Sequence, residues 1–325
     1  MKPRLLAPLA AIACTAALAA PEPEPPTPAS IVAEAAPQEW AAIAPEDLLV
    51  MQLAPDAAGR PRPVVIQLLP PPLSQGWVHN IRTLAAAHWW DGTSVYRVVD
   101  NWVAQWGDGE EEKANAKPLP EGLNVVPESE YEVDTQAFPL GGMTAYEGAG
   151  SDSYAGHAGF WKGWPIAGNA NAMWPTHCYA SLGVARDLSP DTGTGAELYA
   201  VIGHSPRQLD RNIAVVGRVI EGIEHLATLP RGTAEAGVYA TQAEHTPILS
   251  VRLASELPEA QRPRFEYLAS ESQSFERYLA IRANRSDAFY RVPAGGVDVC
   301  NVQVPIRRIT ADAAPRDAQA AGHSG

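Results

Sequence analysis

Short apolar segments, rich in β-branched residues and separated by turn-forming stretches, dominate the hydrophobic pattern of this chain. Segments of this length, bounded by Gly, Pro, Asn and Asp, are typical of β-strands. The first two segments are joined by APDAAGRPRP and are expected to pair as a hairpin with a long loop. The pattern predicts strands at residues 48–53, 64–69, 94–99, 102–106, 178–185, 197–203, 213–219 and 248–253.

Helical periodicity is confined to a few places. Trp77, Ile81 and Leu84 fall on one face of a predicted helix. A shorter helix is expected at residues 221–226, and another at residues 275–282 near the C-terminus. Many strands and few helices predict a mostly β protein.

Three stretches lie outside this regular pattern. Residues 20–44 begin with a run of Pro, Ala and Glu that has little to bury, so they are predicted to form an extended tether. Residues 109–175 have low periodicity, an acidic run and a Gly/Ala/Ser-rich tract, which predict a long loop insertion. The core domain is therefore placed at residues 45–255, and residues 256–325 are expected to form a small α/β extension.

The N-terminus has the pattern of a secretory signal peptide. Lys2 and Arg4 precede an apolar stretch that ends in small residues at 17–19. Cleavage at that point would remove residues 1–19 and leave a periplasmic or secreted protein. The alternative is a lipoprotein signal with Cys14 acylated. Because no other apolar run approaches the ~18 to 20 residues that span a bilayer, no transmembrane segment is expected in the mature chain.

The charge balance argues against one class of partner. The chain has 37 Asp and Glu against 24 Lys and Arg, a formal net charge of -13. The predicted cleavage removes basic residues only, so the mature chain is more acidic still. A chain this acidic is not expected to bind nucleic acid.

Signal-peptide cleavage would leave two cysteines, Cys178 and Cys300. In an oxidising compartment two remaining thiols favour a disulfide, which would tie the C-terminal extension to the middle of the chain. The alternative is two buried thiols that pack as small apolar groups.

The segment VYRVVDNWVAQWGD, which starts at Val95, contains Arg97 and Gln105 among apolar residues. In regular strands Val95, Arg97 and Val99 would point to one face, and Val103 and Gln105 would also share a face. Polar side chains on an apolar face need partners. The segment alone leaves open whether those partners are structural or functional.

Four sequence blocks, in order and with suitable spacing, resemble the cyclophilin-type peptidyl-prolyl cis/trans isomerase family. The resemblance covers roughly residues 45–255 and implies a closed, mostly antiparallel β-barrel of about eight strands with two capping helices. The blocks are HNIR at 79–82, YRV at 96–98 with WVAQWGD at 102–108, GAELY at 195–199, and the segment from Leu209-Asp210 to VGRV at 216–219.

The resemblance implies roles for individual residues. Arg97 matches the family's catalytic arginine, and Gln105 matches the glutamine that orients it and contacts the substrate backbone. The other matching positions are Trp102, Val103 and Tyr199 for walls of the proline pocket, and Ala185 and Arg186 for the edge-strand segment whose backbone holds the substrate.

Other positions depart from the family pattern. Glu197 stands where the family has glutamine and adds negative charge near the groove. Arg207 or Gln208, depending on a one-residue gap, stands where a tryptophan is common, and Ile213 stands at the position of the pocket histidine. These substrate-binding positions predict reduced or altered turnover.

The implied function is isomerisation of X-Pro bonds in unfolded or exported proteins. Arginine stays protonated and presents a rigid fork of donors, so neither a cofactor nor a metal is expected. One alternative is a chaperone or assembly factor that binds prolyl peptides without turnover. A more distant alternative is a glycan hydrolase, which would need two carboxylates about 5 to 9.5 Å apart in a cleft.

Overall fold

The computed structural model describes residues 25–110, 114–139, 141, 143–144, 152–287 and 289–310. The predicted signal peptide and Cys14 lie outside these residues. Within the described ranges, every helix is too short or too polar to cross a bilayer.

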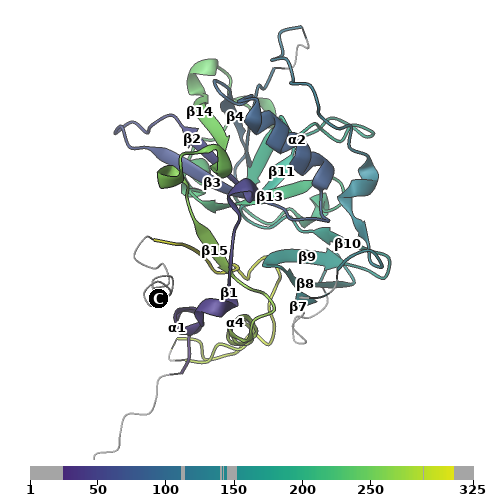
Figure 1. Cartoon of the computed structure of the whole chain (residues 1–325), viewed down its shortest axis with the longest axis vertical. Helices are drawn as coiled ribbons and strands as arrows, with labels where there is room; N and C mark the ends of the chain where they lie inside the picture. The colour runs from purple at the N-terminus through teal and green to yellow at the C-terminus, as the bar shows by residue number, and fades with distance from the viewer. Residues whose placement is uncertain are drawn as a thin grey trace, which may run out of the picture.

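Eight antiparallel strands close into a barrel, as the sequence analysis predicted (Figure 1). In the first hairpin Leu49, Met51 and Leu53 of one strand, and Val64 and Ile66 of the next, are buried in the main core. The sequence analysis recognised these segments as strands from their β-branched composition and turn-rich boundaries. Around the barrel the order is β11 (Ser181–Val184), β12 (Leu198–Val201), β5 (Val103–Gly107), β4 (Ser94–Val98), β14 (Thr246–Leu253), β2 (Leu48–Leu53), β3 (Arg62–Leu68) and β13 (Val215–Glu221).

Two helices pack on the barrel, in agreement with the two capping helices expected. α2 (Gln75–Ala86) buries Trp77 and Ile81 in the main core, on the face that its periodicity predicted. α3 (Glu224–Ala227) is a single turn that buries Leu226 in the same core.

The insertion at 109–175 is not only a loop, so this part of the prediction is wrong. Its described residues contain a second antiparallel sheet in the order β6-β10-β9-β8-β7. Periodicity gave no signal because the strands are two to five residues long, and several contain glycine or proline. They are β6 (Val133–Asp134), β7 (Met143–Thr144), β8 (His157–Trp161), β9 (Trp164–Gly168) and β10 (Ala172–Pro175).

The N-terminal and C-terminal segments together form a small second unit, called here the terminal unit. Ile31 near the start and Phe275 near the end share one buried cluster, which also contains Phe160 of the insertion sheet. Figure 1 shows this unit against the barrel and beside the insertion sheet. Its elements are α1 (Pro28–Glu34), α4 (Gln273–Ala283) and a sheet in the order β1 (Trp40–Ala42), β15 (Phe265–Leu268) and β16 (Ile306–Arg308).

An extended tether at residues 20–44 is therefore wrong for residues 28–44. The hydroxyl of Thr27 accepts a hydrogen bond from the backbone N–H of Ser30 at 3.1 Å and caps α1. Pro28 follows at the first helical position, which suits its fixed φ. The residues that cover Ile31 come mostly from the distant C-terminal extension, so local composition underestimated what this segment buries.

A disulfide joins Cys178, just before β11, to Cys300, which lies between α4 and β16. This is the pairing that the sequence analysis favoured over two buried thiols. The bond closes a sequence separation of 122 residues and attaches the terminal unit to the barrel.

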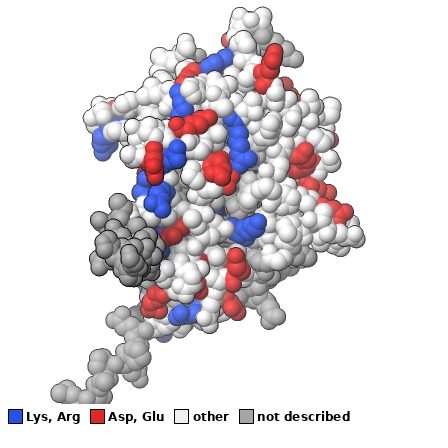
Figure 2. Space-filling model, in the orientation of Figure 1, with Lys and Arg blue, Asp and Glu red and all other residues white. Residues whose placement is uncertain are grey.

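The surface charge is mixed on the face shown in Figure 2. Lys and Arg side chains are interspersed with Asp and Glu, with wide uncharged areas between them. Proteins that follow a phosphate backbone need a basic patch or stripe, and this face has none.

Candidate active site

A β-bulge brings Arg97 and Gln105 together on the outer face of the barrel. Arg97 lies opposite Gln105 in the pairing of β4 with β5, and the register shifts at Tyr96. Val95 is therefore buried in the main core, whereas Arg97 is only partly buried. The prediction that Val95 and Arg97 share a face is wrong because of this extra residue.

Neutral groups hold Arg97 in place. Its Nη1 donates to Oε1 of Gln105 at 2.8 Å, and its Nε donates to the carbonyl oxygen of Ala236 at 2.7 Å. The guanidinium carbon lies 5.9 Å from the centre of the Trp102 ring. Burial lowers the pKa of Arg97 from its ordinary value, but a guanidinium remains protonated at neutral pH. Within the described residues Nη2 has no hydrogen-bond acceptor, so it can donate to a substrate.

Gln105 is itself oriented by a second layer of contacts. Its Nε2 donates to the hydroxyl of Tyr96, which lies within hydrogen-bonding reach of Glu197. Glu197 accepts a hydrogen bond from the backbone N–H of Asp108 at 2.8 Å. Burial raises the pKa of Glu197, although these hydrogen bonds oppose the shift. Glu197, whose charge the sequence analysis placed near the groove, therefore lies behind the Arg97–Gln105 pair.

The apolar floor of the groove is one cluster contributed by neighbouring strands. It brings together three residues that the sequence analysis assigned to the proline pocket, and Ala185, which it assigned to the edge-strand segment. Two of the predicted pocket residues, Val103 and Tyr199, are nearly covered, so a pyrrolidine ring would contact mainly the partly buried members. The cluster consists of Val103 (3% exposed), Tyr199 (4% exposed) and Val201, with Val99, Ala185 and Ile213 packed against them.

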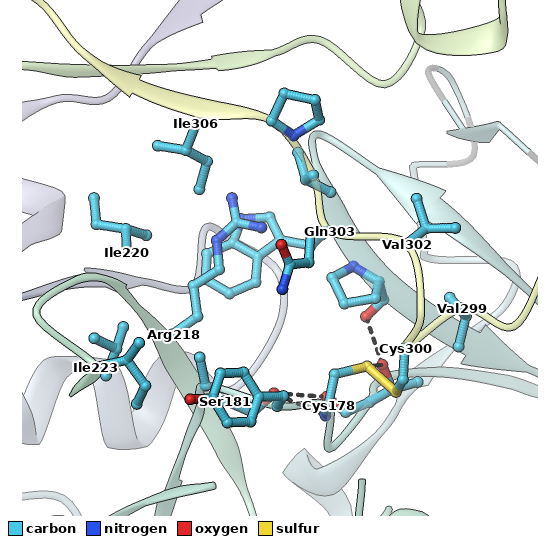
Figure 3. Close-up of a pocket in the computed structure, with 18 of the residues that line it drawn as sticks. Cys178, Ser181, Arg218, Ile220, Ile223, Val299, Cys300, Val302, Gln303 and Ile306 are labelled. Atoms are coloured by element: carbon cyan, nitrogen blue, oxygen red, sulfur yellow. Dashed lines mark hydrogen bonds between the residues drawn. A yellow bond between two sulfur atoms is a disulfide. The ribbon is translucent and has the colours of Figure 1, made fainter. Parts of the chain in front are cut away.

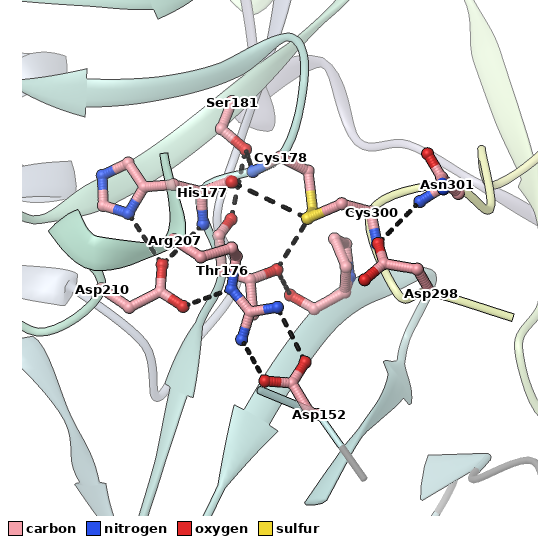
Figure 4. Close-up of a disulfide and its surroundings, with 11 residues drawn as sticks. Asp152, Thr176, His177, Cys178, Ser181, Arg207, Asp210, Asp298, Cys300 and Asn301 are labelled. Carbon is pink, nitrogen blue, oxygen red and sulfur yellow. Dashed lines mark hydrogen bonds and ion pairs between the residues drawn. A yellow bond between two sulfur atoms is a disulfide. The ribbon is translucent and has the colours of Figure 1, made fainter. Parts of the chain in front are cut away.

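A buried polar network beneath Tyr199 was missed by sequence reasoning (Figure 4). The Tyr199 hydroxyl lies 2.9 Å from Nε2 of His177, whose Nδ1 lies 3.0 Å from Oδ1 of Asp210. Oδ2 of Asp210 accepts from Nε of Arg207 at 2.6 Å. Both terminal nitrogens of Arg207 donate to Asp152 in the insertion, at 2.8 and 3.1 Å. The network fixes the Tyr199 ring from below and links the groove floor to the insertion.

Two of the predicted contact residues lie at the rim. Trp102 is 38% exposed and stands beside Arg97, as a pocket wall would. Gln208 is exposed, and its neighbour Arg207 is the buried member of the ionic network. Of the two candidates for the tryptophan position, only Gln208 therefore faces solvent.

The segment after β11 was expected to hold the substrate backbone. The N–H of Ala185 already donates to the carbonyl oxygen of Glu197 at 2.9 Å. The guanidinium of Arg186 donates to the carbonyl oxygen of Asn212 at 2.9 and 2.7 Å. Both residues flank the floor cluster, but the Ala185 N–H is not available to a peptide.

Arg97 brings a charged hydrogen-bond donor to the apolar floor, and Arg186 places a second charge beside it. Among the described residues, no group of three or more His, Cys, Asp or Glu could hold a metal ion. The arrangement can bind an apolar ring and donate a charged hydrogen bond beside it.

Comparison with known proteins identified one matching family model. The model described as cyclophilin type peptidyl-prolyl cis-trans isomerase matches residues 75–253. This range contains every candidate residue of the groove and excludes most of the terminal unit. No curated protein matches the chain.

Among the solved structures that match, a bacterial cyclophilin shows the same similarity at the level of the fold. The cyclophilin AquaCyp293 from Hirschia baltica is 21% identical, with 87% of this chain and 98% of that chain covered and a TM-score of 0.60. A cyclophilin type peptidyl-prolyl cis-trans isomerase from Cryptosporidium parvum is 13% identical, covering 64% of this chain and 96% of that one with a TM-score of 0.38. Its structure in the presence of the dipeptide Ala-Pro is 12% identical, covering 63% and 98% with a TM-score of 0.35.

Proposed function

Because the chain belongs to the cyclophilin-type peptidyl-prolyl cis-trans isomerase family, we propose that its outer groove isomerises X-Pro bonds with Arg97 as the catalytic residue. The observation that carries the proposal is the environment of Arg97. The guanidinium is held by Gln105 and Ala236, keeps Nη2 available, and stands beside an apolar floor.

The reaction needs no bond to be broken. Amide resonance gives the X-Pro bond a rotation barrier of ~18 to 20 kcal/mol. A guanidinium can donate to the prolyl nitrogen as it pyramidalises, or hold the carbonyl oxygen, and so stabilise the twisted state more than either planar state. Acceleration by about five powers of ten requires only about 7 kcal/mol of such differential stabilisation.

The neighbouring residues supply position and shape. Gln105 fixes the guanidinium fork by accepting one of its N–H groups, and the Tyr96 hydroxyl fixes Gln105 in turn. Trp102, Val99 and Ile213 offer the exposed or partly exposed apolar surface on which a pyrrolidine ring can rest. In this proposal Arg97 provides the charge, and its neighbours provide the geometry.

An isomerase assay on a proline tetrapeptide, by protease coupling or NMR exchange, tests the assignment. Arg97→Ala should lower kcat/KM by about 100-fold or more, since it removes the charged donor that stands beside Trp102 and the apolar floor. Arg60→Ala is the control, because Arg60 lies in the hairpin loop and its side chain is 79% exposed. Equal rates for wild type and Arg97→Ala would overturn the proposed role of Arg97.

A second candidate function is prolyl-peptide binding without turnover. It is favoured by Ile213 at the position of the family's histidine and by Gln208, which is exposed where a tryptophan is common. The same tetrapeptide should then bind saturably in a titration, while wild type and Arg97→Ala give equally slow exchange. Fast exchange by wild type would dismiss this candidate.

We further propose that the substrates are exported proteins. Support comes from the signal-peptide pattern at residues 1–19 and from the Cys178–Cys300 disulfide, since such bonds persist in oxidising compartments. Expression of the full chain in a bacterium, followed by fractionation and N-terminal sequencing, should yield a periplasmic protein that begins at Ala20. Recovery of the uncleaved chain in the cytoplasm would contradict export.

A further inference from the structure

A cavity of about 730 Å³ lies at the junction of the barrel, the insertion sheet and the terminal unit (Figure 3). Its walls come from β11 and β13 of the barrel, from β9 and β10, from α1, and from residues 299–307. The volume is within the range of small-molecule binding sites. None of the groove residues discussed above lines this cavity, so it is a separate site.

Among the described residues, the lining of the cavity is mostly apolar and contains no acid. Its walls include Val32, Val219, Ile220, Ile223, Val302 and Ile306. The chain has 37 acidic residues against 24 basic ones, yet among the described residues that line the cavity the charged side chains are two arginines, Arg218 and Arg307. Arg307 is already paired with Glu266, its Nε lying 2.6 Å from Oε1.

Arg218 has a different environment, because all of its partners are neutral. Its Nε and Nη2 donate to Oε1 of Gln67 at 3.0 and 2.8 Å, and Nη1 donates to the carbonyl oxygen of Gly163 at 2.7 Å. The guanidinium carbon lies 4.2 Å from the centre of the Trp164 ring. These bonds occupy one N–H of each nitrogen, which leaves a second N–H on both terminal nitrogens.

The charge of Arg218 is not balanced by any carboxylate in the described part of the chain. Burial lowers the pKa of Arg218 to about 9, which still leaves the guanidinium protonated at neutral pH. Figure 3 shows it near the middle of the cavity, with Gln303 beside it and Ile220 and Ile306 nearby. An unpaired charge in apolar surroundings is costly, and a bound anion would offset that cost.

We propose that this cavity binds an aliphatic carboxylate of the fatty-acid class, with the acid group on Arg218 and the hydrocarbon chain along the valine and isoleucine walls. A free N–H on each terminal nitrogen suits a carboxylate, whose oxygens accept charge-assisted hydrogen bonds from a guanidinium. The apolar walls suit the chain, because each buried methylene adds to the affinity. This ligand matches both the charge and the lining.

Calorimetric titration of the full chain with decanoate, below its micelle concentration, tests the proposal. Decanoate should bind saturably at one site and at least about tenfold more tightly than decanol, which has the same tail without the charge. Arg218→Met should lose at least about tenfold in decanoate affinity and little in decanol affinity. Equal affinity of wild type for decanoate and decanol would overturn the proposal.

A second variant keeps the test valid if Arg218→Met fails to fold. Gln303→Glu would place a carboxylate beside Arg218 and occupy its free N–H groups from within the chain. This variant should fold and lose decanoate binding, whereas Gln303→Met, which has similar length and no charge, should retain it. If Gln303→Glu binds decanoate as tightly as wild type, Arg218 is not the anchor and the proposal fails.

Discussion

The outer groove and the junction cavity contain arginines with closely similar surroundings. Arg97 donates to the side-chain oxygen of Gln105, and Arg218 donates to that of Gln67. Each also donates to a backbone carbonyl oxygen and lies near a tryptophan ring. Burial lowers the pKa of both, and among the described residues neither has a carboxylate partner. Amide and carbonyl acceptors position the guanidinium without cancelling its charge.

Arg207, directly beneath the groove, shows the opposite arrangement. It is paired with Asp152 at 2.8 Å and with Asp210 at 2.6 Å. Burial acts to lower the pKa of Arg207, but its hydrogen bonds and charge interactions with these carboxylates outweigh burial and raise the pKa. The difference suggests that Arg207, which is held by carboxylates, stabilises the fold, whereas Arg97 and Arg218 keep a charge that is available to ligands.

Replacing Arg207 or Arg218 with methionine gives the largest expected difference in unfolding free energy. Arg207→Met leaves Asp152 and Asp210 buried without their cation, so the free energy of unfolding should fall by about 3 to 5 kcal/mol. Arg218→Met removes a cation that had no carboxylate partner but leaves the oxygens of Gln67 and Gly163 without their donor, so its unfolding free energy should fall by about 1 to 2 kcal/mol. Urea unfolding at pH 7 measures both.

A larger loss of stability in Arg218→Met than in Arg207→Met would contradict the proposed difference between the two arginines. If Arg218→Met were the more destabilised variant, an uncompensated charge could not explain its surroundings. A double variant, Arg207→Met with Asp152→Asn, should recover part of the loss, because it also removes one of the two stranded carboxylates.

Arg97→Lys tests whether the groove uses the guanidinium fork or only its charge. Lysine keeps the charge but cannot donate to Gln105 and to a substrate in the same geometry. We expect kcat/KM for a proline tetrapeptide to fall by about 100-fold, with little change in unfolding free energy. Arg252→Lys is the matched control, since Arg252 is partly buried and held by Asp91 away from the groove. A lysine variant as active as wild type would show that charge alone is sufficient.

Most of the barrel could be predicted because its strands carry their own signal. Segments such as LLVMQL and VVIQLL are short, apolar and rich in β-branched residues, and all six residues of VVIQLL are buried. The insertion sheet and α1 were missed since their strands and helix are very short, and what they bury is supplied by distant parts of the chain. The bulge at Tyr96 was also beyond reach, because one extra residue reverses a face without changing composition.

The site shows the same division. The pairing of Gln105 with Arg97 was predicted from the family resemblance, whereas the bulge that places the two residues opposite each other was not. The network beneath Tyr199 joins residues that are 33 and 55 positions apart in the sequence, so no local sequence pattern predicts it. Glu197 was located next to the right strand, but its orientation behind Gln105 depends on the bulge and on the turn after β5.

Glu197→Gln is expected to have the smallest effect of these variants. It tests the buried carboxylate that lies behind the Arg97–Gln105 pair. Glu197 is the carboxylate linked to Arg97 through Tyr96 and Gln105, without touching the guanidinium. Its folded-state pKa is raised above the ordinary value of 4.5 by burial. The folded protein therefore holds a proton that the unfolded chain has released, and stability falls as pH rises through the interval between the two pKa values.

Glutamine does not titrate, so the unfolding free energy of the variant should increase relative to that of wild type as pH rises through that interval. At pH 7 we expect it to be more stable by up to about 1 kcal/mol. The amide oxygen can still accept from the backbone N–H of Asp108, so the support behind Gln105 is retained. Urea unfolding from pH 4.5 to pH 8 measures the difference. If the difference in unfolding free energy between the variant and wild type stays constant across this range, Glu197 does not titrate there. A variant that is less stable than wild type at pH 7 would mean that the charge of Glu197 supports the Arg97 site.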